Sequence, residues 1–200
     1  MLPHKQKIGL MILAAGNSSR MNGEQKQLLI FRNKTLLRHA AETAIQSDFE
    51  IVVVVLGANA EKLIDEIVDL PLQIGVNKNW QDGMGSSIKT GITMLSEKNL
   101  DAVIIMLCDQ PLITKETLKK LDETFAKNER LIIACEYDET IGVPALFSSQ
   151  LFPELINLKQ FEGAKKLIKK YLENTILIST PEASIDIDTI EDYEKFKQIS

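Results

Sequence analysis

A loop of small residues that also carries two cations follows the first apolar run of the chain, Ile8–Ala14. Gly16 has no side chain, so the backbone there can approach a ligand closely, and consecutive N–H groups can point at an anion. Arg20 adds a planar fork of donors that suits two phosphate oxygens, and Lys26 adds a compact point charge. These residue types within one loop predict a phosphate-binding site.

The spacing in this loop excludes two common phosphate motifs. A Walker A loop needs four residues between its glycines and a lysine directly after the second one, whereas six residues separate Gly16 from Gly23. A dinucleotide fingerprint needs the pattern G-x-G-x-x-G, and Gly16 lacks those partners. A tight turn between strand and helix, with two solvated cations, stays open as the alternative interpretation.

A second glycine-rich stretch opens a predicted helix in the middle of the chain. Gly83 and Gly85 permit a sharp turn into that helix, and Ser86 or Ser87 could cap it while facing the edge of a base. The free N-terminal end of a helix also favours an anion. The alternative is a glycine-rich cap with Trp80 as a packing anchor and no ligand.

Carboxylates that could bind a metal occur at two further places in the sequence. Asp109 comes directly after an apolar run, and Mg²⁺ prefers one or two protein carboxylates together with substrate phosphates. The alternative role of Asp109 is a hydrogen bond to nearby backbone ahead of Pro111. Asp186 and Asp188 share one face of a predicted strand, because residues i and i+2 point the same way. We expect Asp186 to be a metal ligand and Asp188 to cap the final helix.

The elements that position these residues alternate between short β-branched runs and amphipathic stretches. This alternation predicts right-handed β-α-β units and a three-layer α/β/α fold with a mostly parallel sheet. In such sheets ligands bind beyond the C-terminal strand ends. The predicted strands cover residues 8–14, 51–56, 72–76, 102–107, 131–135, 143–147 and 175–178. The predicted helices cover residues 35–46, 60–68, 86–96, 115–127, 148–158, 163–173 and 190–197, with Thr114 at the start of the fourth.

Composition limits the class of protein further. The 200 residues predict one domain, and 44% hydrophobic with 26% charged residues is an ordinary globular composition. The net charge of −5 with no basic stripe argues against nucleic-acid binding. No apolar run approaches the roughly 20 residues of a membrane span, and no cleavage site follows the first one. We therefore expect a cytoplasmic protein that binds neither nucleic acid nor membrane.

Four further residues are expected to have packing roles. Cys108 and Cys135 lie in apolar runs, which favours buried thiols over a disulfide or a metal site. His39 has no motif around it, so a surface or packing role is expected. Met84 is interpreted as a core filler.

The loops together resemble one known family, the molybdenum-cofactor nucleotidylyltransferases. The first loop is similar to its signature L-A-[AG]-G-x-S-x-R-[MF]-G-x-x-K, although Asn22 stands where the family usually has glycine, with Gly23 beside it. The second loop resembles the N-x-x-W-x-x-G-M-x-x-S pattern of the cytidylyl branch, and Asp109 lies in a D-Q-P motif. Ala15 also favours that branch, because the guanylyl branch resembles L-A-G-G at this point.

The resemblance implies a Rossmann-like nucleotidyltransferase fold over residues 1–200, with a nucleotide-binding part in about 1–112 and an acceptor-binding part in about 113–200. It implies catalytic roles for Arg20, Lys26 and Asp109 and a metal site made of Asp109 with Asp186 or Asp188. The residues that it implies for nucleotide binding are Leu13, Ala14, Ala15, Gly16, Asn17, Ser18, Arg20, Lys26, Gly83, Met84, Gly85, Ser86 and Ser87.

The acceptor side departs most from the family's pattern. Residues 142–147 match a G-x-P-x-L-F segment near the acceptor, but Val143 stands where the family often has histidine. Residues 160–165 match G-D-x-G-A-R only in part, because Phe161 replaces the aspartate and Lys165 the arginine. This second segment is implicated in binding the pterin, so the departures put the identity of the acceptor in doubt.

The expected reaction is transfer of CMP from CTP to molybdopterin with release of pyrophosphate, supported by Mg²⁺ or Mn²⁺, and a molybdoenzyme is the expected recipient of the product. GTP, or another phosphorylated acceptor such as a sugar or polyol phosphate, stays open within the same chemistry. A non-catalytic carrier of the finished cofactor is the alternative of another class. A nucleotide-binding oxidoreductase ranks third, because the glycine fingerprint is missing.

Overall fold

A seven-stranded sheet forms the centre of the molecule, in the order β5-β4-β1-β6-β8-β7-β9. The computed structural model describes residues 6–199 of the chain. Its central strand β1 (Ile8–Ala14) pairs in parallel with β4 (Ile51–Leu56) on one side and β6 (Ala102–Leu107) on the other, and β5 (Gln73–Val76) extends the sheet beyond β4. All seven residues of β1 are buried, as a strand covered on both faces requires.

The other half of the sheet contains the one strand that departs from the parallel pattern. β8 (Thr140–Ser148) runs antiparallel between β6 and β7 (Ile132–Tyr137), and β9 (Thr175–Ser179) pairs in parallel with β7. β7 and β8 are joined by a hairpin rather than by a crossover helix, which explains why the regular rhythm of the sequence loosens there. The mostly parallel sheet predicted from the sequence is confirmed.

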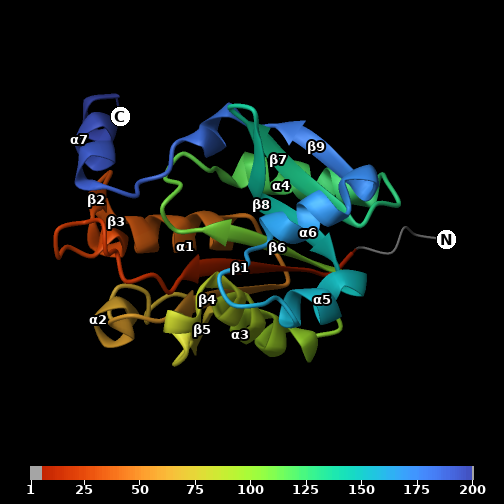
Figure 1. Cartoon of the computed structure of the whole chain (residues 1–200), viewed down its shortest axis with the longest axis horizontal. Helices are drawn as coiled ribbons and strands as arrows, with labels where there is room; N and C mark the ends of the chain where they lie inside the picture. Colours follow the sequence, from red (N-terminus) through yellow and green to blue (C-terminus); the bar gives the residue numbers. More distant parts are fainter. Residues whose placement is uncertain (1–5, 200) are drawn as a thin grey trace.

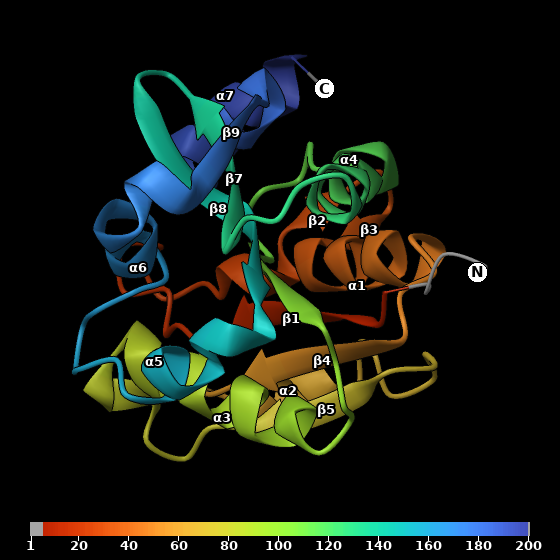
Figure 2. The same ribbon diagram turned by 90° about the vertical axis from the view of Figure 1, so that its right-hand side faces the viewer.

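Helices cover both faces of this sheet. α1 (Leu36–Gln46), α4 (Lys115–Ala126) and the short α2 (Ala60–Ile64) pack on one face, and α3 (Met84–Ser96), α5 (Phe152–Ile156) and α6 (Lys165–Lys170) on the other. Figure 1 shows the order of the elements, and Figure 2 shows α1 and α4 on the side of the sheet away from α5 and α6. The three-layer α/β/α architecture is therefore confirmed.

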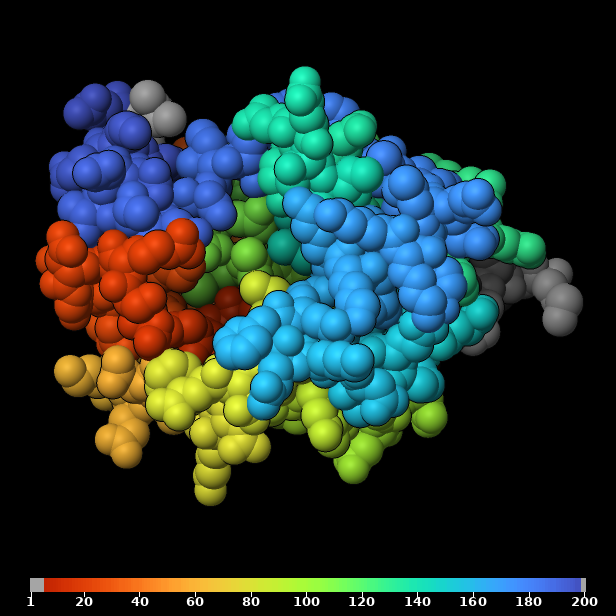
Figure 3. Space-filling view, viewed as in Figure 1, coloured from red at the N-terminus to blue at the C-terminus, as the bar shows by residue number. Residues whose placement is uncertain are grey.

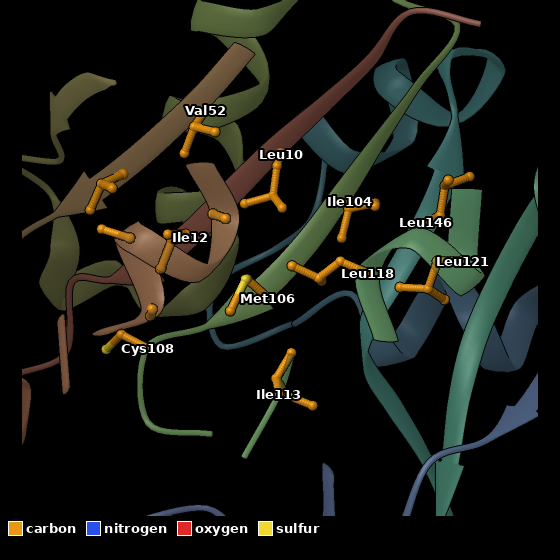
Figure 4. Close-up of a cluster of buried hydrophobic side chains, with 14 of the residues drawn as sticks. Leu10, Ile12, Val52, Ile104, Met106, Cys108, Ile113, Leu118, Leu121 and Leu146 are labelled. Atoms are coloured by element: carbon orange, nitrogen blue, oxygen red, sulfur yellow. The ribbon is translucent and has the colours of Figure 1, made fainter. Parts of the chain in front are cut away.

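Alternate side chains of β1 supply two separate cores. Leu10 and Ile12 belong to the core on the α1/α4 face, which Figure 4 shows with Leu118 and Leu121 of α4 packed over the strands. Met11 of β1 belongs to the core beneath α3 on the opposite face. This period-two alternation follows from strand geometry, and it leaves the C-terminal strand ends to hold the polar residues.

A third, smaller apolar cluster ties the first loop to the C-terminal helix. The β2 (Ile30–Phe31) and β3 (Lys34–Thr35) hairpin lies against α7 (Ile190–Ile199), as Figure 1 shows. The buried members of the cluster are Met21, Leu29, Phe31, Leu36, Ile187 and Phe196. Because Met21 lies between the two loop cations in the sequence and Ile187 lies between two aspartates, this packing brings the two ends of the described chain to one site.

Two local predictions at the helix starts have different outcomes. Thr114 does cap α4, since its hydroxyl accepts a hydrogen bond from the N–H of Thr117. The cap predicted for Asp188 is wrong, because Thr189 and Asp192 exchange hydrogen bonds at the start of α7. Asp188 is therefore free to face the site.

The segment with the two aspartates is not a strand. A 3₁₀ helix covers Pro181–Ser184, and residues 185–188 lie outside every sheet. The N–H of Ile187 donates instead to the main-chain oxygen of Asp109 over 3.0 Å. Ile187 is buried, while Asp186 and Asp188 both face the same cavity, so the expected sharing of one face is seen without the strand.

Other predicted helices are shorter than expected, notably α2, α5 and α6. The prediction of two buried thiols is confirmed, because Cys108 and Cys135 are both free and buried. Within residues 6–199, none of the helices combines the length and the apolar character that crossing a membrane would need.

Candidate functional site

A cavity of about 550 Å³ opens at the C-terminal ends of β1 and β6, beside the start of α3. Figure 3 shows the surface hollowed where red, yellow and blue segments of the chain meet. The residues that line the cavity are Leu13, Ala14, Ala15, Gly16, Asn17, Arg20, Lys26, Gln27, Trp80, Gln81, Gly83, Met84, Ser87, Leu107, Cys108, Asp109, Phe161, Asp186 and Asp188. The strand ends, where the sequence predicted ligand binding, thus form a real cavity.

The shape of the first loop depends on Gln27, which is fully buried. Its amide nitrogen donates to the carbonyl oxygens of Ala14 (3.1 Å) and Gly16 (2.8 Å), and its amide oxygen accepts a hydrogen bond from the Ser18 hydroxyl (3.0 Å). That hydroxyl also accepts from the N–H of Lys26 over 3.0 Å. One side chain therefore joins the beginning of the loop to its end and gives it a fixed form before any ligand binds.

The cations of the loop meet carboxylates from two distant parts of the chain. The Lys26 ammonium donates to Asp109 and, over 2.9 Å, to Asp188, and Arg20 donates to Asp188 over 2.8 Å. Burial alone would lower the pKa of Lys26, but attraction and hydrogen bonding from Asp109, with a further bond from Asp188, raise it above its usual range. Lys26 is therefore always charged and clamps the carboxylates together.

The pKa values of the two aspartates near the C-terminus are shifted in opposite directions. Burial opposes ionisation of Asp188, yet its hydrogen bonds and attraction to Lys26 and Arg20 lower its pKa. Burial, followed by repulsion from Asp188 and Asp109, raises the pKa of Asp186. The ion pairs of Arg20 and Lys26 go to Asp188 and Asp109 rather than to Asp186, so further positive charge in the cavity would be favourable there.

Asp109 carries an unsatisfied oxygen. The side chain is almost entirely buried, and its Oδ1 atom has no hydrogen-bond partner among the described residues. A buried acceptor without a partner is costly, and a cation or its bound water would satisfy it. Among the residues that the structure describes, no three acidic, histidine or cysteine side chains are close enough to hold a metal unaided. These donors fit Mg²⁺, which takes part of its shell from substrate phosphates and water.

The second loop follows its prediction only in part. Gly83 precedes α3 with φ of 90°, and no side chain caps that end. The Ser86 hydroxyl donates to the carbonyl oxygens of Asn79 (2.9 Å) and Gly83 (2.8 Å), so the prediction that Ser86 caps this helix is wrong. Ser87 lines the cavity, and Asn77 donates to its hydroxyl over 3.0 Å.

A second, apolar cavity of about 260 Å³ adjoins the first and shares four of its lining residues, Leu13, Met84, Leu107 and Phe161. Ile105 of β6 and Tyr137 of β7 form part of its other walls. The remaining lining residues come from the two segments that the resemblance places on the acceptor side, and they are Gly142, Val143, Gly163, Ala164 and Lys165. The site is therefore a polar, charged cavity that continues into an apolar one.

Comparison with known proteins places this geometry in a family. Residues 10–175 match the model of the MobA-like NTP transferase domain. The chain belongs to this family. Membership supports nucleotidyltransferase activity, and the cavity described above lies almost wholly within the matched residues.

The curated relatives of this MobA-like chain differ in their stated activities. It is 29% identical to a nicotine blue oxidoreductase of Paenarthrobacter nicotinovorans, covering 90% of this chain and 92% of that protein. It is 28% identical to the purine catabolism protein PucB of Bacillus subtilis (strain 168), over 94% and 95%. It is 25% identical to a molybdenum cofactor guanylyltransferase of Aliivibrio fischeri (strain MJ11), over 93% of each.

Solved structures agree with the fold of this MobA-like chain. Rv0371c from Mycobacterium tuberculosis H37Rv superposes with a TM-score of 0.84 at 25% identity, covering 97% of this chain and 99% of that one. A structure of Rv0371C in complex with manganese has a TM-score of 0.80 at 24% identity, over 97% and 100%. The likeness therefore extends over the whole described molecule.

Most of the residues predicted to bind nucleotide line the first cavity, but several of its lining residues were not predicted. Of the residues predicted to bind nucleotide, Ser18, Gly85 and Ser86 do not line the cavity; Ser18 supports the loop, and Gly85 packs against the loop before α6. Met84 is not a core filler, since it is 44% exposed and lines both cavities. The residues missed are Gln27, Trp80, Gln81, Leu107, Cys108 and Phe161. Gln27 could have been found from its position, because a polar residue directly before the apolar pair Leu28 and Leu29 can be buried with them.

Proposed function

We propose that this chain transfers CMP from CTP to a molybdopterin-type acceptor and releases pyrophosphate. The observation that carries the proposal is the cluster of Arg20, Lys26, Asp109 and Asp188 in the cavity, together with the loop around Gly16 and the adjoining apolar cavity. This arrangement offers a charged place for a triphosphate and an adjoining place for a second substrate.

The reaction needs positioning and charge neutralisation more than a base. A terminal phosphate of the acceptor is largely ionised at neutral pH, so it can attack the α-phosphorus directly. A bond forms between that oxygen and the α-phosphorus, the α–β bridging bond breaks, and its electron pair leaves with pyrophosphate. Arg20, Lys26 and the N–H groups around Gly16 would bind the phosphate oxygens whose charge grows during this step.

A divalent cation, Mg²⁺ or Mn²⁺, fits the carboxylates of the site. Asp109, with Asp186 or Asp188, would hold it together with phosphate oxygens and water, and the unsatisfied Oδ1 atom of Asp109 supports this assignment. Bound there, the cation would neutralise phosphate charge. The structure of Rv0371C in complex with manganese supports the choice of a divalent metal. Arg20 and Lys26 would exchange their carboxylate partners for phosphate oxygens when the metal and nucleotide enter.

Alternatives differ in nucleotide, acceptor or class. Ala15 lines the cavity and supports CTP, whereas the guanylyltransferase relative keeps GTP open. A sugar or polyol phosphate stays open as the acceptor, and a carrier of the finished cofactor is the alternative without catalysis. The oxidoreductase name of another relative suggests redox chemistry for that protein. The paired cations and carboxylates of this site favour phosphate chemistry here.

The deciding experiment measures pyrophosphate release from CTP, GTP, ATP and UTP in turn, with and without molybdopterin. We expect release with CTP and molybdopterin, and a loss of about a hundredfold or more in Asp109→Asn. Asp65→Asn, at an exposed aspartate at the end of α2, is the matched control and should keep full activity. Preference for GTP would overturn the nucleotide assignment, full activity of Asp109→Asn would overturn the metal assignment, and no release with any pair would favour the carrier.

A further inference from the structure

Phe161 is an aromatic side chain that the fold leaves in solvent at the border of the two cavities. It is 78% exposed, more than any other large apolar side chain among the described residues. It lines both the charged cavity and the apolar one. An exposed aromatic ring at the edge of a cavity gains free energy only when something covers it, which points to a ligand.

The backbone holds this ring outward in a conformation that bulky residues rarely adopt. Phe161 has φ of 63°, in the left-handed region where glycine is favoured. Its N–H donates to the carbonyl oxygen of Asp82 over 3.3 Å, which ties its loop to the loop before α3. A Cβ added at Gly83 would lie 2.7 Å from the Phe161 nitrogen, so Gly83 allows this close approach. A strained, exposed aromatic residue at this position suggests function rather than packing.

The apolar cavity beside Phe161 has few polar groups to offer. The Tyr137 hydroxyl already donates to the carbonyl oxygen of Val143 over 3.2 Å. Among the described residues that line the cavity, Lys165 alone carries a charge. A sugar or polyol brings several hydroxyl groups that would lose their hydrogen bonds to water here without replacement. A flat ring would instead cover apolar walls such as Leu107 and stack on Phe161.

We propose that Phe161 determines acceptor specificity: its ring stacks on a flat heteroaromatic part of the acceptor in the second cavity and disfavours sugar and polyol phosphates. The inference rests on the proposed transfer function, because it assigns the second cavity to the acceptor. Met84 forms the neighbouring part of the rim, since a Cβ at Gly163 would lie 2.8 Å from its Sδ atom. Phe161 positions the acceptor and takes no part in bond making.

The test compares binding of a fluorescent flat probe, pterin-6-carboxylate, with binding of ribose 5-phosphate. We expect Phe161→Ala to weaken binding of the pterin about tenfold, as loss of one stacking partner does. Phe161→Tyr keeps the ring and should restore binding to within about threefold of the native protein. Because Phe161 also lines the first cavity, binding of CTP with Mg²⁺ should weaken in Phe161→Ala by less than binding of the pterin does. Leu172→Ala removes another exposed apolar side chain away from both cavities and serves as the control.

Phe161→Gly separates this role from a structural one. Glycine accepts the left-handed conformation without strain, so this variant should melt at the same temperature as the native protein or higher, yet bind pterin-6-carboxylate as poorly as Phe161→Ala. A clear drop in melting temperature would show that the ring packs the fold and would overturn the proposal. Equal pterin binding by Phe161→Ala and the native protein, or a loss confined to CTP binding, would overturn it as well.

Failure of the transfer function gives a different pattern of results. If no pair of nucleotide and acceptor releases pyrophosphate but pterin binding still depends on Phe161, the transferase proposal fails and the specificity role stands. If pyrophosphate is released and the Phe161 variants match the native protein with both acceptors, the specificity proposal fails and the transferase proposal stands.

Discussion

Gln27 shows how one buried polar side chain can organise a ligand-binding loop. Its amide satisfies two carbonyl oxygens of the loop and accepts from the hydroxyl that in turn holds the N–H of Lys26. A loop whose shape is fixed in advance does not lose conformational freedom again when the nucleotide binds. Gln27 therefore contributes to binding without touching phosphate.

We predict that Gln27→Leu lowers the free energy of unfolding by about 1–3 kcal/mol, because the buried carbonyl oxygen of Ala14 and its neighbours lose their donor. The loop should also lose its fixed form, so the KM for the nucleotide should rise. Urea denaturation and nucleotide titration measure the two effects. Gln73→Leu, at an exposed glutamine on the edge strand β5, is the control and should change neither. Reduced stability with unchanged nucleotide affinity would show that this loop does not bind the nucleotide.

The sequence predicted that Arg20 and Lys26 belong to one loop beside a cavity, but their carboxylate partners could not be predicted. Arg20 and Lys26 were predicted as phosphate ligands from their type and spacing. The structure pairs both with carboxylates, and Asp188 lies 168 residues from Arg20 in the chain. Such pairings depend on how α7 packs against the β2–β3 hairpin, and no local sequence pattern predicts that contact.

Among the elements, those of the parallel half were predicted best. β1, β4 and β6 have the predicted bounds, because strands buried on both faces read as continuous apolar runs ended by polar residues. The C-terminal half was harder, since α5 and α6 are single short helices beside 3₁₀ turns. Residues 185–188 alternate between apolar and acidic side chains as a strand would, but they pair with no strand. The alternation instead comes from the burial of Ile187 between two aspartates that face the cavity.

α1 carries a histidine whose surroundings make stability depend on pH. His39 is half-buried, its Nε2 atom lies 3.0 Å from the carbonyl oxygen of Pro111, and its ring meets Phe31 edge-on. Burial lowers the pKa of His39 below its usual value of 6.5, and the cations Arg32 and Lys34 lower it further, against the raising effect of the Pro111 hydrogen bond and of Glu42. The unfolded chain therefore binds a proton at this histidine more readily than the folded protein does.

We predict that His39 lowers the free energy of unfolding at acidic pH. Well above pH 6.5 it is neutral in both states and has no effect, and as the pH falls toward and below that value the unfolded state gains protons first. The urea midpoint of the native protein should therefore fall between pH 7.5 and 5. His39→Gln should show a smaller fall over the same range. An identical pH dependence in both proteins would mean that His39 titrates normally.

The net negative charge of the whole molecule is also found locally at the first cavity. The chain carries a net charge of −5, and the charged residues that line the first cavity are Asp109, Asp186 and Asp188 against Arg20 and Lys26, which sum to −1. A bare nucleoside triphosphate adds several negative charges to a site that is already slightly negative. One divalent cation changes the local sum to +1, so metal and nucleotide should bind together.

Metal dependence of nucleotide binding is therefore the prediction that tests the charge balance. We expect CTP with Mg²⁺ to bind at least about tenfold more tightly than CTP in EDTA, a difference of about 1.4 kcal/mol. Asp188→Asn brings the sum to zero and frees both cations from that partner, so it should bind bare CTP better than the native protein does and need Mg²⁺ less. Calorimetry at fixed ionic strength measures both ratios, with Asp65→Asn as a change of equal charge on the surface. If bare CTP bound the native protein as tightly as its magnesium complex, the carboxylates would have no role in admitting the nucleotide, and the charge on Lys26 and Arg20 would suffice.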